Sequence, residues 1–206
     1  MDSILVERTE TDDKLLRISA QMDEFEAYDG AHGKRVAAIA ESLAVAYNLA
    51  SRDRFFLQQA ALVHDIGEMS MNRDYIRSPG VLSASERIDL QRHPVIGEQE
   101  TARLNVSRGV QLIIRWHHEW WNGSGYPDGL EAEQIPLAAR ILRVADTYAS
   151  MTAARPYRSA RTAEETKRYL IEWAGIEFDP GVVKAFVTLP QPERVRTEPV
   201  VHVGAM

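Results

Sequence analysis

Histidines gather in the first part of the chain, in a pattern that could support metal chemistry. Five of the six histidines of this 206-residue sequence lie between positions 32 and 118: His32, His64, His93, His117 and His118. Three of them belong to two adjacent pairs, His64-Asp65 and His117-His118, and Asp146 lies within the largely apolar stretch ILRVADTYASM. Imidazoles and carboxylates that converge in a core are costly unless a divalent cation neutralises and orders them.

The number of residues between successive members of this set is about that of one helix plus the segment that leads back to the same end. Antiparallel helices joined in this way can bring their ends to one place. A His/Asp set without thiolates favours iron, manganese or zinc, and a carboxylate flanked by imidazoles is suited to bridging two ions that clamp a phosphate. A lone histidine on an apolar face is more often a hydrogen-bonded core residue. Spacing alone therefore leaves two alternatives open, a metal site and ordinary core packing.

The stretches around these residues have the pattern of amphipathic helices. Residues 33–49 place apolar side chains on one helical face: Val36, Ile39, Ala40 and Leu43. Residues 52–67 predict a second, largely apolar helix that ends at Gly67. Residues 109–121 and 137–154 predict further helices, and no segment alternates apolar and polar residues as a strand does. The sequence therefore predicts a single all-α domain.

Capping signals mark where several helices begin. Ser83 with Glu86, and Thr162 with Glu165, have the spacing of a capping box, in which each side chain bonds to the other residue's backbone amide. Pro94 lies inside an apolar pattern, where it forces one helix to end and another to begin. We therefore expect helices to start after Ser83 and Thr162, and a break just before Pro94.

Composition excludes several classes of protein. The sequence has no cysteine, which excludes disulfides, a thiolate nucleophile and Cys-based zinc or iron–sulfur sites. No apolar run approaches the ~18 residues of a membrane span, and the acidic first residues do not form a secretory signal. The net charge of -6 argues against a surface that coats nucleic acid. We expect a cytoplasmic protein with no membrane and no nucleic-acid partner.

Six short blocks occur in the order that is typical of HD-GYP proteins, a branch of the HD phosphohydrolase superfamily. They are HDIG (64–67), HPVIG (93–97), HHEWWNGSGYPDG (117–129), RVAD (143–146), RPYR (155–158) and FDP (178–180). The chain resembles this family over about residues 26–189. The resemblance implies an HD-domain helical bundle with a GYP loop, here residues 122–129. It leaves an N-terminal helical extension over 1–25 and a poorly ordered tail over 190–206.

The resemblance implies a bacterial cyclic di-GMP phosphodiesterase that opens its substrate to pGpG and onward to GMP by metal-assisted hydrolysis. It implies two divalent metal ions, most often iron or manganese. Positions matching His64, Asp65 and Asp146 hold the first ion in the family. Those matching His93, His117 and His118 hold the second, with Asp65 bridging and His32 at the same cluster. His64 and Asp65 are thus the expected catalytic residues.

The resemblance also implies substrate and partner contacts. Arg155 and Arg158 match positions that contact substrate phosphates, which suits the planar guanidinium. Without the family, we would interpret both arginines as solvated loop charges. Tyr126 lies in the GYP loop, where a purine-stacking or a partner-binding role is expected. That partner would be a diguanylate cyclase domain or a separate sensor protein.

Three positions depart from the family's pattern. Glu68 stands where the family usually has a lysine that helps hold a substrate phosphate, and an acid there repels a phosphate. Ala149 stands where the family often has an aspartate. Tyr28 replaces the glutamate of three-metal members, so we expect two metals. These changes leave two alternatives open: a phosphohydrolase for another nucleotide, and an altered module that binds a nucleotide or a partner protein.

Overall fold

The computed structural model describes residues 10–28, 30–155 and 158–189. In these ranges the chain is helical, and extended pairing is limited to isolated bridges between single residues. The prediction of an all-α fold is therefore confirmed. The predicted tail over 190–206 lies outside the described residues, as do the first nine residues of the expected N-terminal extension.

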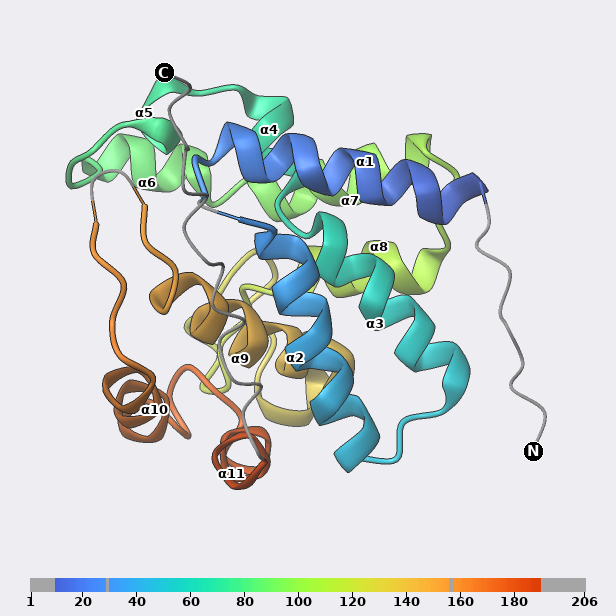
Figure 1. The fold of residues 1–206 in the computed structure, drawn as a ribbon, viewed down its shortest axis with the longest axis vertical. Coiled ribbons are helices and arrows are strands. Elements are labelled where there is room, and N and C mark those ends of the chain that lie inside the picture. The colour runs from blue at the N-terminus through green and yellow to red at the C-terminus, as the bar shows by residue number, and fades with distance from the viewer. Residues whose placement is uncertain (1–9, 29, 156–157, 190–206) are drawn as a thin grey trace, which may run out of the picture.

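Figure 1 shows the helices in chain order. Their bounds are α1 Glu10–Phe25, α2 His32–Ala46, α3 Ser51–Val63, α4 Ile66–Met71, α5 Asp74–Arg77, α6 Ala84–Leu90, α7 His93–Arg103, α8 Arg108–Trp116, η1 Ala132–Gln134 (a 3₁₀ helix), α9 Leu137–Met151, α10 Ala163–Glu172 and α11 Pro180–Thr188.

The core lies where α2, α3, α8 and α9 meet. The apolar face predicted on residues 33–49 is buried, since Val36, Ile39, Ala40 and Leu43 are at most 3% exposed. In Figure 1, α2 and α3 run side by side while α1 lies across one end of that pair. Leu15 and Met22 of α1 join the same buried cluster. The helical extension thus packs on the core, while its boundary at residue 26 stays a prediction.

The capping signals are confirmed. Ser83 and Thr162 each accept a hydrogen bond from the amide three residues later, and both capping boxes are complete. α6 ends at Leu90 and α7 begins at His93, so the break before Pro94 is also present.

None of the helices in the described part of the chain is long and apolar enough to cross a membrane.

The prediction that Gly67 ends a helix is wrong. α3 ends at Val63, four residues earlier, and Gly67 lies within the short helix α4. A Cβ atom at Gly67 would lie 2.0 Å from the carbonyl oxygen of His93. Glycine is therefore needed there because α4 and α7 approach closely, and this approach brings His93 toward the end of α3.

Candidate metal centre

Three of the predicted histidines lie at helix ends, and their rings fold back in the same way. His64 follows α3, His117 follows α8, and His93 follows the end of α6. Each Nδ1 lies at the carbonyl oxygen three residues earlier, at 3.0 Å for His64, 2.8 Å for His93 and 2.6 Å for His117. Carbonyls in the last turn of a helix lack an intrahelical partner, and a carbonyl only accepts. Nδ1 therefore donates, and in the neutral ring Nε2 presents a lone pair.

Two of these lone pairs meet at one oxygen of Asp65. His93 Nε2 lies 3.3 Å and His117 Nε2 lies 3.4 Å from Asp65 Oδ1. The two Nε2 atoms are also 3.4 Å apart. When both rings are neutral with Nδ1 protonated, three hydrogen-bond acceptors converge here. A cation among them removes that conflict.

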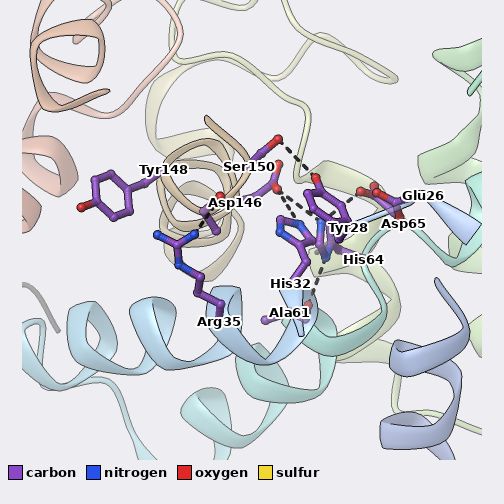
Figure 2. A network of polar contacts seen from close by, with 12 residues as sticks. Glu26, Tyr28, His32, Arg35, Ala61, His64, Asp65, Asp146, Tyr148 and Ser150 are labelled. Atoms are coloured by element: carbon purple, nitrogen blue, oxygen red, sulfur yellow. Dashed lines mark hydrogen bonds and ion pairs between the residues drawn. The ribbon is translucent and has the colours of Figure 1, made fainter. Parts of the chain in front are cut away.

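The other oxygen of Asp65 belongs to a second group (Figure 2). His64 Nε2 lies 3.1 Å from Asp65 Oδ2 and 3.5 Å from Asp146 Oδ1. His32, at the start of α2, places its Nε2 3.3 Å from the same Asp146 oxygen. The two oxygens of Asp65 therefore face two separate sets of ligand atoms, as a bridging carboxylate requires.

Charge in this cluster is strongly coupled. Burial by itself raises the pKa of the Asp65 and Asp146 carboxyls, but the adjacent imidazoles outweigh burial and hold both pKa values well below the usual range. Burial by itself lowers the pKa of His64, and the Asp65 and Asp146 carboxylates raise it well above its ordinary value. Burial lowers the pKa of His117, which stays a neutral donor of an electron pair. The cluster thus presents ionised carboxylates together with imidazoles.

Several polar atoms of this cluster are buried without a hydrogen-bond partner. They are both ring nitrogens of His32, Nε2 of His64 and Oδ1 of Asp65. Unpaired buried polar atoms cost free energy, and coordination to a metal ion satisfies them. By distance, the acidic and imidazole side chains form two groups that fit divalent ions. One group is Asp65, His93, His117 and His118, and the other is His32, His64 and Asp146. All seven predicted ligands are therefore brought together.

His118 differs from the other histidines in its hydrogen bonding. Its Nδ1 lies 2.7 Å from Nη1 of Arg143, a residue of α9. The ring is stacked on Tyr126, with centroids 4.9 Å apart and planes inclined by 16°. Burial, followed by the neighbouring His117 and Arg143, lowers the pKa of His118 well below its ordinary value.

A cavity of about 300 Å³ opens beside the cluster. Asp65, Asp146 and His118 line it, together with Arg155. Arg155 forms an ion pair with Glu26 at 3.3 Å, and its guanidinium lies 4.0 Å from the centroid of the Tyr28 ring. One of the two predicted phosphate contacts thus faces the cavity next to the cluster.

The second predicted phosphate contact lies elsewhere. Arg158 is exposed, is not among the residues that line the cavity, and donates to the carbonyl oxygen of Ser150 at 2.6 Å. Tyr126 is not in the lining either, although its ring covers His118. Within the described residues, the structure therefore brings Arg155 to the cavity and leaves Arg158 and Tyr126 at its periphery.

The positions that depart from the family's pattern lie in different surroundings. Glu68 lines the cavity, where burial and then the nearby Asp65 raise its pKa to about 7. Ala149 is fully buried in the core. Tyr28 stacks on His32 with ring centroids 3.9 Å apart and donates to the Ser150 hydroxyl at 3.2 Å, as Figure 2 shows. An acid therefore faces the cavity, and an aromatic ring covers the early histidine.

Sequence reasoning missed Glu26 and Arg143. Glu26 is 3% exposed and lines the cavity, and burial, followed by Asp65 and Glu68, raises its pKa well above the ordinary value. Nothing in its acidic surroundings, MDEFEAYD, distinguishes it in the sequence. Arg143 carried a signal, because it is a charged residue on an apolar helix, three positions before Asp146 and so on the same face.

The GYP loop is anchored by a buried carboxylate that the sequence analysis also missed. Glu119 is 2% exposed and accepts backbone amides of Asp128, Gly129 and Leu130 at 2.7 to 3.1 Å. Asp128 in turn accepts the Trp116 indole N–H at 2.7 Å. These bonds hold the loop against α8, next to His118.

The profile of the HD domain family matches residues 16–182. The chain belongs to the HD domain family, in its HD-GYP branch. One relative is the cyclic di-GMP phosphodiesterase response regulator RpfG of Xanthomonas campestris pv. campestris, 37% identical over 75% of this chain and 41% of the relative. Another is 3'3'-cGAMP-specific phosphodiesterase 2 of Vibrio cholerae, 31% identical over 88% of this chain and 35% of the relative.

A solved structure of an HD-GYP protein has a similar fold. An HDG"Y"P protein from Bdellovibrio bacteriovorus superposes with a TM-score of 0.62 and 20% identity, covering 76% of this chain and 50% of that chain. This likeness confirms the HD-domain helical bundle. The HD-GYP chain described here spans less than half the length of the two curated relatives above.

Proposed function

We propose that this HD-GYP chain is a metal-dependent phosphodiesterase that hydrolyses cyclic di-GMP to pGpG and then to GMP. The observation that carries the proposal is the convergence of histidine Nε2 atoms on both oxygens of Asp65. Two groups of ligand atoms that share one carboxylate fit a pair of divalent ions. We propose iron or manganese, which suit imidazole and carboxylate ligands.

Each residue then has a definite task. His32, His64 and Asp146 would hold one ion, and His93, His117 and His118 the other, with Asp65 between them. His118 lies within the second group by distance, although its Nδ1 is bound to Arg143. When bound, the ions supply Lewis-acid activation of a water molecule and of the phosphodiester. The carbonyl bonds to each Nδ1 orient the rings before any ion arrives.

The substrate would lie in the adjoining cavity. Arg155 is the cation there that would bind a phosphate, and to do so it exchanges its ion pair with Glu26 for the substrate. Contacts of Arg158 and Tyr126 with the substrate stay predictions, as does docking of a diguanylate cyclase or sensor protein on the GYP loop. A cytoplasmic location likewise stays a prediction.

A second candidate function is hydrolysis of a different cyclic dinucleotide. Glu26 and Glu68 place carboxyl groups within 4.8 Å of a carboxylate oxygen of Asp65, in the cavity where a phosphate would bind. Both cyclic dinucleotides carry two phosphodiesters and differ only in their bases, so these carboxyl groups could select between them by accepting hydrogen bonds from a base. One of the relatives is named for 3'3'-cGAMP, so this nucleotide is the second substrate to test.

The test is hydrolysis by protein from which metal has been removed and then restored anaerobically as iron or manganese. Cyclic di-GMP and 3'3'-cGAMP are offered separately, products are resolved chromatographically, and metal content is measured in the same sample. We expect about two ions per chain and turnover of cyclic di-GMP. Asp65→Ala should lose both, whereas Asp13→Ala, at an exposed carboxylate of α1, should lose neither. Two bound ions without turnover of either nucleotide would refute the proposed activity.

A further inference from the structure

The cavity beside the metal centre has one part that the proposed metal chemistry does not use. Six of the residues that line it come from a single segment, α5, α6 and the loop between them. We call them the α5–α6 wall: Tyr75, Ile76, Ser78, Gly80, Leu82 and Leu90. The rest of the lining includes the predicted metal ligands Asp65 and Asp146 and the acids Glu26 and Glu68. The cavity therefore joins a charged part to a wall of different chemistry.

The α5–α6 wall presents apolar surface although it contains two hydroxyl groups. The Tyr75 hydroxyl donates to Oδ2 of Asp89 at 2.9 Å, and the Ser78 hydroxyl donates to the carbonyl oxygen of Asp74 at 2.8 Å. Both hydroxyl protons are thus used within the segment itself. The other side chains of the wall, two leucines and an isoleucine, are aliphatic.

Contacts at both of its helices hold this segment in place. In α6, Asp89 accepts Nε of Arg73 at 3.0 Å as well as the Tyr75 hydroxyl, which joins α6 to α5. In α5, the guanidinium of Arg77 lies 4.9 Å from the centroid of the Phe25 ring, at the end of α1. In Figure 1, α5 and α6 lie together beside that end of α1. The wall is therefore pre-organised, so a ligand need not order it on binding.

A cyclic dinucleotide has both kinds of surface that the cavity combines. Its phosphodiesters are anionic and suit metal ions and the guanidinium of Arg155. Its bases have flat faces that pack on apolar or aromatic side chains, and hydrogen-bonding groups only at their edges. A base that packs on the α5–α6 wall stays in the same cavity as the carboxyl groups of Glu26 and Glu68, which can accept bonds from its edge.

We propose that the α5–α6 wall is the base-binding surface of this cavity, with Leu82 and Leu90 in contact with the face of a purine base of the substrate. The phosphodiester next to that base then lies between Arg155 and the metal centre. Packing on a base face is tolerant of base identity, so the wall supplies affinity and leaves discrimination to groups at the base edge. The choice of a nucleotide as the ligand rests on the function proposed above.

The first test measures whether a base contributes to binding. Isothermal titration calorimetry of the manganese-loaded protein compares GMP with ribose 5-phosphate, which has the sugar phosphate but no base. The wild type should bind GMP more tightly by about tenfold or more, and Leu82→Asn should lose most of this difference with its affinity for ribose 5-phosphate unchanged.

The matched control for Leu82→Asn is Val81→Asn. Val81 is the preceding residue, is 92% exposed and is not among the residues that line the cavity, so this variant should bind both ligands as the wild type does. A wild type that binds GMP no more tightly than ribose 5-phosphate would overturn the proposal. Equal losses of GMP affinity in the two variants would overturn it as well.

The second test uses hydrolysis. For each cyclic dinucleotide that the wild type hydrolyses, Leu82→Asn and Leu90→Asn should raise KM by about tenfold, with kcat and metal content unchanged, because the wall binds substrate and transition state alike. Ile88→Asn, at a 67% exposed position of α6 outside the lining, is the control and should leave KM unchanged. A lower kcat at unchanged KM would mean that these leucines act through the metal centre, which would refute the wall.

The wall and the proposed activity can fail separately. Binding that depends on the base, in a wild type that hydrolyses no cyclic dinucleotide, would support the wall and refute the activity. Hydrolysis by a protein that binds GMP and ribose 5-phosphate equally would support the activity and refute the wall.

Discussion

Replacing the acid in the cavity should change how stability depends on pH. Glu68 is a glutamate whose ordinary pKa of 4.5 is raised to about 7 by burial and then by the adjacent Asp65. A raised carboxyl pKa means that the folded protein binds this proton more tightly than the unfolded chain does. The stabilisation that the protonated Glu68 carboxyl gives the folded protein is fully present below pH 4.5 and is lost as the pH rises through about 7.

The size of the effect follows from that pKa difference. A rise from 4.5 to about 7 corresponds to about 3 kcal/mol between the fully protonated and fully ionised extremes. Glu68→Gln cannot ionise and escapes this loss. Between pH 5 and pH 8, the free energy of unfolding of the variant should therefore rise relative to wild type by about 2 to 3 kcal/mol.

The assay is urea unfolding of metal-free protein, followed by the helical circular dichroism signal at both pH values. Metal must be removed because a cation beside Asp65 would change the charge that Glu68 experiences. Glu172→Gln, at an exposed position of α10, is the matched control and should shift stability by less than about 0.5 kcal/mol at either pH. A difference between Glu68→Gln and wild type that is the same at pH 5 and pH 8 would refute the reasoning.

Two further predictions concern the same part of the molecule. Glu68→Lys replaces a carboxyl that faces the cavity with a cation, so kcat/KM on cyclic di-GMP should rise by about tenfold, the equivalent of 1.4 kcal/mol. No change or a loss in steady-state assays would mean that the acid is adapted to this site. Gly67→Ala places a Cβ 2.0 Å from the His93 carbonyl oxygen, so α7 must move, at a cost of about 1 to 3 kcal/mol. Wild-type stability in urea would contradict the close approach of α4 and α7.

Much of this protein could be predicted from local sequence patterns. The apolar faces, the two capping boxes and the restart at Pro94 depend on residues within a few positions of one another, and the structure has all of them. The cluster of histidines and aspartates was also predictable, through spacing and the resemblance to HD-GYP proteins. Side chains at helix ends lie near orphaned carbonyls of their own chain segment, so even the Nδ1 bonds of His64, His93 and His117 are local.

Other properties of the site depend on contacts between distant segments. Glu26 and Arg155 form an ion pair although 129 residues separate them, and nothing near either residue in the sequence predicts their meeting. The local sequence predicts that Gly67 ends a helix, whereas glycine is needed there because α7 packs closely against α4.

The sequence by itself determined which residue types gather, because helix periodicity and helix-end chemistry are local. Only the tertiary structure decided which partner each ring nitrogen of those residues meets. His117 and His118 are adjacent and chemically identical, yet one faces a carbonyl of its own helix and the other a guanidinium from α9. The proton of an imidazole follows its hydrogen-bond partner, and that partner is set by packing.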